Sequence, residues 1–164
     1  MTAWAAKKDE LYDLYRELIL DHARKPRHFG RLDHATHTAQ GINPLCGDKL
    51  ELYCIVDESS RIKAVSFEGS GCAISVASAS LLTDTVIGLR VTQAETIFDA
   101  ITSRLTRRDD GDRNDIDSNF ETRYEKLVAL DGVREFPSRV KCATLAWHAL
   151  HSALNGQAVP ATTE

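Results

Sequence analysis

The sequence lacks the features that would take it to a membrane or to nucleic acid. Its 164 residues contain no apolar run long enough to cross a bilayer. The N-terminus becomes charged at Lys7 and Lys8 instead of continuing into the apolar core of a signal peptide. The 20 basic residues are outnumbered by 24 acidic ones, so there is no basic excess for a nucleic-acid surface. We therefore expect a cytoplasmic protein that binds neither membranes nor nucleic acid.

Internal repeats, low-complexity tracts and interdomain linkers are also missing from the sequence. A chain of 164 residues can bury a core without disulfide bonds, and 43% apolar with 27% charged residues is typical of a globular protein. We expect one domain over residues 1–164. The stretch Arg107–Asn119 mixes charges of both signs and has almost nothing to bury, which predicts an exposed polar insertion at about residues 107–120.

A two-residue periodicity predicts strands in the first half of the chain. Apolar residues alternate with polar ones in Lys49–Asp57, and a second strand, Arg61–Glu68, follows a polar turn. The segment Thr36–Ile42 carries a weaker strand pattern. These three segments predict a small antiparallel sheet of about three strands.

A helical periodicity predicts helices on both sides of these strands in the sequence. Apolar residues recur there at steps of three and four, which gives each helix one apolar face for a core. The predicted helices are Lys8–Ala23, Cys72–Ile87, Thr92–Leu105, Tyr124–Leu130 and Ser138–Leu154. The expected fold class is α+β, with the sheet packed against several helices.

Cysteine is scarce, and four cysteines without a secretion signal are better explained as metal or redox ligands than as a disulfide framework. Three of them lie at the boundaries of predicted elements. Cys46 lies with Asp48 in the loop before a strand, Cys72 begins a helix after a Gly-Ser-Gly turn, and Cys142 falls in the first turn of the last helix. Helix N-termini favour the thiolate, which is the form that binds metal and attacks sulfur.

Three thiolates and one carboxylate would make a four-coordinate set suited to zinc. Thiolates also suit iron–sulfur clusters, so the spacing does not choose the metal. Because the candidate ligands are far apart in the sequence, the pattern by itself leaves a shared metal site and three unrelated buried cysteines equally open.

The fourth cysteine and the histidines do not extend this set. Cys54 lies in mid-strand on the apolar face, where we expect it to fill the core. A six-residue step separates His148 from Cys142, which does not bring the two together on a helix, and His148 and His151 are expected to be partly buried or solvated. Nothing in the sequence orients the remaining candidates, which are His28, His34 and His37.

Three motifs resemble those of a known family. The segments Asn43–Asp48, Gly69–Ser75 and Arg139–Trp147 match motifs of the IscU/NifU-like family in the right order, and Leu14–His22 is similar to its N-terminal stretch. Within that family the chain resembles the SufU branch. It has Lys141 where scaffold members carry a histidine before the last cysteine, and its interval between the second and third motifs is longer.

The resemblance implies roles for individual residues. It implies an α+β fold in which Cys46, Asp48, Cys72 and Cys142 bind Zn²⁺. Cys46 would also accept a persulfide, and Arg139 would help to organise the site or the contact with a partner. The implied function is that of a zinc-dependent sulfurtransferase, which takes sulfur from a SufS-type cysteine desulfurase and serves downstream cluster assembly proteins.

Two alternatives remain open on the sequence. The first is a scaffold that assembles a [2Fe–2S] cluster on the same side chains. The second is a non-catalytic interaction module that zinc stabilises, in which removal of the metal would unfold the protein.

Overall fold

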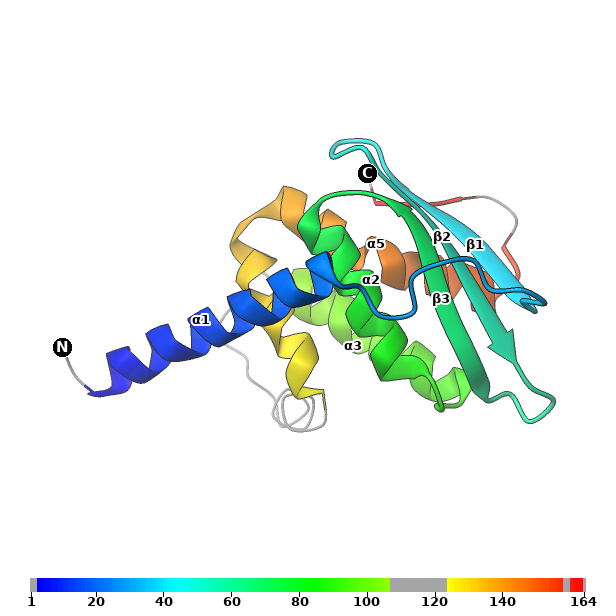
Figure 1. The fold of residues 1–164 in the computed structure, drawn as a ribbon, viewed down its shortest axis with the longest axis horizontal. Coiled ribbons are helices and arrows are strands. Elements are labelled where there is room, and N and C mark those ends of the chain that lie inside the picture. Colours follow the sequence, from blue (N-terminus) through cyan, green and yellow to red (C-terminus); the bar gives the residue numbers. More distant parts are fainter. Residues whose placement is uncertain (1–2, 107–123, 158–159, 164) are drawn as a thin grey trace.

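The computed structural model describes residues 3–106, 124–157 and 160–163 of the chain (Figure 1). Its elements are, in order, α1 (Ala3–Arg24), β1 (His37–Asn43), β2 (Asp48–Val56), β3 (Ile62–Ser70), α2 (Ala73–Val86), α3 (Val91–Thr106), the 3₁₀ helix η1 (Glu125–Glu135), α5 (Pro137–Leu154) and β4 (Ala161–Thr162). The predicted polar insertion at about residues 107–120 lies outside the described residues. Within the described part of the chain, no helix has the length and apolar character needed to cross a membrane.

The sheet has the strand order β3-β2-β1-β4. Strands β1 and β2 pair antiparallel, as do β2 and β3, which confirms the small antiparallel sheet expected from the sequence. The structure adds a fourth strand, β4, which runs parallel to β1 and pairs Ala161 with Gly41. Its two residues are too short to carry a periodicity, so the sequence pattern could not reveal it.

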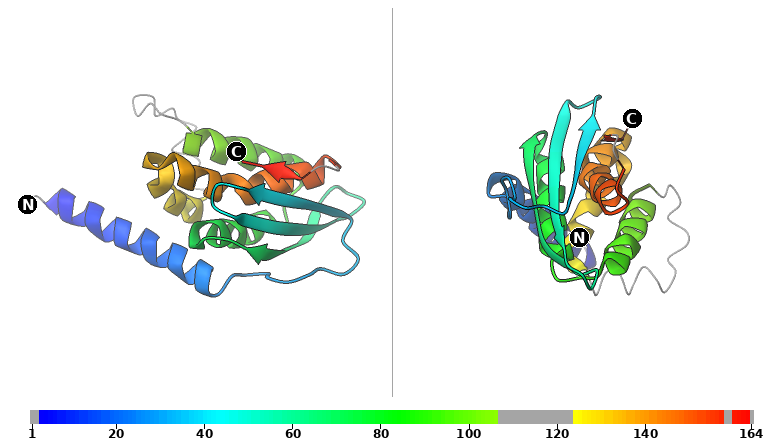
Figure 2. Two further views of the ribbon diagram at one scale, coloured as in Figure 1. Left: turned by 90° about the horizontal axis from the view of Figure 1, so that it is seen from above. Right: turned by 90° about the vertical axis from the view of Figure 1, so that its right-hand side faces the viewer.

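The core lies between the sheet and the helices that cover one of its faces. In the right-hand view of Figure 2 the strands stand on one side and α5 and α3 on the other. Leu52 and Cys54 of β2 are fully buried on the inner face, as the alternation predicted. Gly41 lets α5 approach β1 closely, because a Cβ there would lie 3.2 Å from Leu145 Cγ. Trp147 of α5 is completely buried, and its indole nitrogen donates to Ser78 of α2 over 3.2 Å.

The helix predicted near residues 124–130 is instead a 3₁₀ helix that continues to Glu135. Its buried side chains include Leu127, Leu130 and Val133, which recur every three residues. Because a 3₁₀ helix has three residues per turn, this spacing aligns them on one face against the core. In so short an apolar segment, the sequence pattern does not distinguish an α-helix from a 3₁₀ helix.

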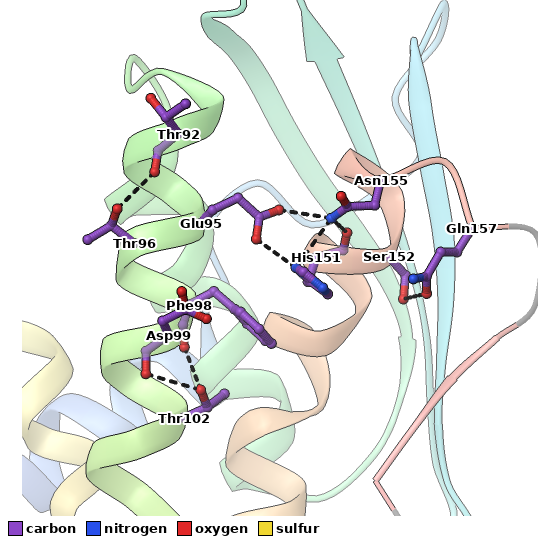
Figure 3. Close-up of polar contacts among 10 residues, drawn as sticks. All are labelled: Thr92, Glu95, Thr96, Phe98, Asp99, Thr102, His151, Ser152, Asn155 and Gln157. Atoms are coloured by element: carbon purple, nitrogen blue, oxygen red, sulfur yellow. Dashed lines mark hydrogen bonds and ion pairs between the residues drawn. The ribbon is translucent and has the colours of Figure 1, made fainter.

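Polar contacts tie α3 to α5, and Figure 3 shows how they converge on His151. Its Nδ1 lies 2.6 Å from Glu95 Oε2, and Asn155 donates to the other carboxylate oxygen of Glu95 over 3.1 Å. The Phe98 ring stacks on the His151 ring with centroids 4.5 Å apart. His148 and His151 are partly buried as expected, and burial lowers the pKa of His148. These histidines therefore serve helix packing on the same helix that carries Cys142.

Helix α1 is anchored on α2 by a buried histidine. His22 is 1% exposed, and its Nδ1 lies 2.7 Å from Ser80 Oγ, while the backbone N–H of Arg27 donates to the same hydroxyl over 2.8 Å. Burial lowers the pKa of His22, so the ring is held neutral where it meets Ser80. Both α1 and the segment after it thereby brace the helix whose N-terminus carries Cys72.

Candidate metal centre

The hairpin loop between β1 and β2 presents Cys46. Asn43 and Asp48 are the last pair of the β1–β2 ladder, and both side chains are buried, with exposed fractions of 0% and 1%. Between them the chain turns through Gly47, whose φ of +69° is a left-handed conformation that glycine adopts without strain. Cys46 lies at the exposed tip. The loop therefore holds two polar side chains inside the protein and one thiol at its surface.

The N-terminus of α2 approaches this loop from the other side. Cys72 caps the helix, its sulfur accepts a hydrogen bond from the backbone N–H of Ser75 over 3.5 Å, and its own N–H donates to Asp48 Oδ1 over 2.8 Å. The prediction that Cys72 lies at a helix start is confirmed, although the first helical residue is Ala73. At this position the helix dipole favours a thiolate.

Gly71 makes this approach possible. A Cβ on Gly71 would lie 2.7 Å from Asp48 Oδ1, closer than real Cβ atoms come to a neighbour. The absence of a side chain is therefore what allows the Asp48 carboxylate to reach the Cys72 N–H. The sequence pattern had treated this glycine only as part of a turn.

Cys142 lies deeper in α5 than the sequence predicted. Helix α5 begins at Pro137, so Cys142 is its sixth residue, and the prediction that it falls in the first turn is wrong. Proline suits the first position of a helix because it has no N–H to pair, and this moves the start to Pro137. The Cys142 side chain is 1% exposed, and burial, with the neighbouring Asp48 carboxylate, raises the pKa of its thiol. The negative charge of a Cys142 thiolate would therefore have to be stabilised by a cation or a hydrogen-bond donor beside it. The N–H groups at the start of α5 are too far away to do this.

The three segments meet at the upper side of the molecule as drawn in Figure 1. Cys46, Asp48 and Cys142 each offer one ligand atom, and these atoms all lie within 4.8 Å of one another. Cys72 lies next to this group, with its sulfur 4.0 Å from Asp48 Oδ2. We call these four residues the thiolate–carboxylate cluster.

The spacing of the cluster can be compared with that of a tetrahedral zinc site. Zinc binds sulfur at about 2.3 Å and carboxylate oxygen at about 2.0–2.2 Å, so its ligand atoms lie roughly 3.5–3.8 Å from one another. The ligand atoms of Cys46, Asp48 and Cys142 lie within 4.8 Å of one another, and Cys72 lies outside that group of three. The donor set fits zinc in its chemistry, and binding of the ion would draw the four ligand atoms closer together.

Arg139 and Cys54 are not members of the thiolate–carboxylate cluster. The Arg139 side chain is exposed, and its guanidinium carbon lies 4.5 Å from the centre of the Phe136 ring at the start of α5. Cys54 is completely buried on the core face of β2, as expected, and burial raises the pKa of its thiol to about 12. Cys54 is therefore an inert part of the core.

One residue of the site was missed in the sequence. The side-chain amide of Asn43 donates to Asp48 Oδ2 over 3.3 Å and to the Cys142 sulfur over 3.4 Å. Its only signal in the sequence was its place at the start of the motif that contains Cys46. Asn43 and Cys142 are 99 residues apart, so no local pattern could connect them.

Substitution of Gly71 by alanine should displace the Asp48 carboxylate and leave the Cys72 N–H without its acceptor. We expect the metal-free protein to lose about 1–3 kcal/mol of unfolding free energy, measured by urea denaturation, because a Cβ would clash with the buried Asp48 carboxylate and the partly buried Cys72 N–H would become unpaired. Gly132→Ala is the matched control, since a Cβ there meets nothing within 4 Å and the change should stay within about 0.5 kcal/mol. A Gly71→Ala protein as stable as the parent would show that this close contact is not needed.

The fold and the cluster together define a class of protein: a small α+β protein that gathers cysteines and an aspartate from a hairpin loop and two helices. The profile described as the NifU-like N terminal domain matches residues 14–143, and the chain belongs to this family. The family predicted from the three motifs is thereby confirmed.

Relatives of the chain have names from iron–sulfur cluster assembly. An iron–sulfur cluster assembly scaffold protein IscU from Thermotoga maritima is 39% identical over 142 residues, which cover 86% of this chain and 92% of the relative. The zinc-dependent sulfurtransferase SufU from Bacillus subtilis is 35% identical over 137 residues, covering 84% and 86% of the two chains. A crystal structure of a SufU protein from Fervidobacterium islandicum, described as a cluster assembly scaffold for the SUF system, superposes with a TM-score of 0.74. Its sequence is 30% identical, and the match covers 84% of this chain and 94% of that one.

Proposed function

We propose that the protein is a cytoplasmic, zinc-dependent sulfur acceptor, which takes persulfide sulfur from a SufS-type cysteine desulfurase for iron–sulfur cluster biogenesis. The observation that carries the proposal is the composition of the thiolate–carboxylate cluster. An exposed thiol, Cys46, lies within 4.8 Å of two buried ligand candidates, Asp48 and Cys142. A sulfur acceptor needs this combination of a protected set of donors and one sulfur that a partner can reach.

The zinc ligands in this proposal are Cys46, Asp48, Cys72 and Cys142. Bound zinc would keep the cysteines deprotonated near neutral pH, which burial alone opposes at Cys142. Thiolate ligands suit both zinc and iron–sulfur clusters. The resemblance to the SufU branch favours zinc, because this chain has Lys141 where that resemblance implies a histidine in scaffold members.

Cys46 is the residue that would accept sulfur. Its thiolate attacks the outer sulfur of the donor's persulfide, the sulfur–sulfur bond of the donor breaks, and the donor cysteine leaves as a thiolate. Cys46 then carries the transferred sulfur as its own persulfide. Cys72 is only partly exposed and Cys142 is buried, so neither offers a docked partner the same access. Because Cys46 lies on an exposed loop, it can turn toward the donor while Asp48 and Cys142 stay in the interior.

Arg139 is a candidate for organising the site or for contact with the desulfurase. Its guanidinium is exposed on the Phe136 ring, at the start of the helix that carries Cys142. An arginine stacked on an exposed aromatic ring is typical of residues that protein partners bind. Downstream cluster assembly proteins would receive the sulfur from Cys46 after the desulfurase has left.

A scaffold that assembles a [2Fe–2S] cluster is the second candidate function. The Thermotoga maritima relative carries the name of a scaffold, and thiolate ligands suit both metals. The two functions differ in what the purified protein contains, because a scaffold would hold iron with acid-labile sulfide.

Metal analysis and sulfur transfer together test the proposal. We expect the protein purified without added metal to contain about one zinc ion per chain and negligible iron. Radiolabelled sulfur from cysteine should move from a SufS-type desulfurase onto the zinc-loaded protein, and a chelator that removes the zinc should stop the transfer. Substantial iron and sulfide would support the scaffold instead. Zinc without any sulfur transfer would point to a structural module.

A further inference from the structure

Asn43 contacts the thiolate–carboxylate cluster from inside the protein. It is 0% exposed at the end of β1, and its Nδ2 lies 3.3 Å from Asp48 Oδ2 and 3.4 Å from the Cys142 sulfur. A primary amide has two N–H bonds, so one nitrogen can serve both acceptors at once. The two atoms that Asn43 joins come from different elements, β2 and α5.

The chemistry of the two acceptors determines which way the amide points. A carboxylate only accepts hydrogen bonds, as does Cys142 when a metal holds it as the thiolate, so the reversed amide would turn its oxygen toward two acceptors. In the observed orientation the oxygen, Oδ1, is buried without a hydrogen-bond partner in the described part of the chain. A buried carbonyl without a partner costs free energy, so the orientation of this amide calls for an explanation.

We propose that Asn43 is a positioning residue, which holds the Asp48 carboxylate and the Cys142 sulfur at the spacing that a single metal ion requires. This inference rests on the metal site of the proposed function. Groups that donate hydrogen bonds to metal ligands orient those ligands and adjust how strongly they bind. Asn43 does this for two ligands with one side chain, and the unpaired Oδ1 is the consequence of using both N–H bonds there.

The test compares Asn43→Leu with the parent protein. Leucine has nearly the shape of asparagine but no donor, so the metal-free variant should be somewhat less stable than the parent in urea, because the buried Asp48 Oδ2 loses a hydrogen bond. We expect its zinc affinity, measured by competition with a chromogenic chelator, to fall about 10–100-fold. The absorption spectrum of the cobalt(II) form should change as well, because the bands report the geometry of the ligands.

Two further variants complete the design. Asn43→Ser keeps one donor and should lose less zinc affinity than Asn43→Leu, and it decides the question if the leucine variant does not fold. Asn155→Leu is the matched control, because Asn155 donates to Glu95 between α3 and α5 and makes no contact with the cluster. It should leave the zinc affinity and the cobalt spectrum unchanged.

Each outcome separates this inference from the proposed function. Parent-like zinc affinity and cobalt spectra in both Asn43 variants would overturn the role of Asn43 alone, as would a change confined to unfolding of the metal-free protein. A parent protein that binds neither zinc nor cobalt would overturn both. Weaker binding in the variants, together with a zinc-loaded parent that accepts no sulfur, would uphold the role of Asn43 and reject the sulfur-acceptor function.

Discussion

Replacement of Cys46 by serine is expected to abolish the acceptance of sulfur from a cysteine desulfurase. A serine hydroxyl has nearly the shape of the thiol but cannot form a persulfide. Because Cys46 is exposed, the substitution should change the unfolding free energy by no more than about 0.5 kcal/mol. The measurement is the radiolabelled sulfur bound to the protein after incubation with the desulfurase and labelled cysteine under anaerobic conditions.

Cys54→Ala serves as the control for the loss of a cysteine. Cys54 is fully buried in the core and lies apart from the cluster, so its removal should leave a small cavity and intact sulfur transfer. Sulfur transfer requires a thiol that the desulfurase can reach, and the buried Cys54 is not accessible to it. Undiminished labelling of the Cys46→Ser protein would reject Cys46 as the acceptor.

Replacement of Asp48 by alanine is expected to weaken both the metal site and the fold. The carboxylate is 1% exposed and accepts hydrogen bonds from the Cys72 N–H and the Asn43 amide. Its loss leaves the partly buried Cys72 N–H without this acceptor and leaves Asn43 with only the Cys142 sulfur. We expect the metal-free protein to lose about 1–3 kcal/mol of unfolding free energy in urea. Zinc affinity should fall by at least about 100-fold. This is more than the usual loss on substitution of a residue that only hydrogen-bonds to a metal ligand.

Two further variants separate the effect of Asp48 on zinc binding from its effect on the stability of the fold. Asp48→Asn keeps an acceptor for the Cys72 N–H but loses the negative charge. It should therefore weaken zinc binding but destabilise the protein less than Asp48→Ala does. Asp57→Ala removes a carboxylate that accepts backbone hydrogen bonds in the turn between β2 and β3, away from the cluster. It should leave zinc affinity unchanged. Parent-like zinc affinity in Asp48→Ala would remove Asp48 from the ligand set.

The sequence predicted most of the architecture because local periodicity reflects burial. Alternation in Lys49–Asp57 identified β2 and correctly assigned Cys54 to the core. Helical periodicity located α1, α2, α3 and α5, although their ends differed by a few residues. The strand β4 was missed because pairing with β1, rather than any pattern in its two residues, defines it.

For the candidate site, the sequence identified the chemistry and the structure determined the geometry. The positions of the cysteines at element boundaries and the three motifs single out Cys46, Asp48, Cys72 and Cys142. The sequence also placed Cys142 in the first turn of its helix. The helix begins at Pro137, one residue before the predicted start at Ser138, and Cys142 is its sixth residue.

The family, the α+β class and the residue types of the cluster follow from short motifs and local periodicity, so they can be predicted from the sequence. The exposure of Cys46, the burial of Asp48 and Cys142, and the approach of three ligand atoms to within 4.8 Å of one another depend on tertiary packing. Tertiary packing also decides that Gly71 gives room to the Asp48 carboxylate and that Asn43 joins Asp48 to Cys142. These are contacts between segments far apart in the chain, and such contacts form only when the sheet and helices pack around one core.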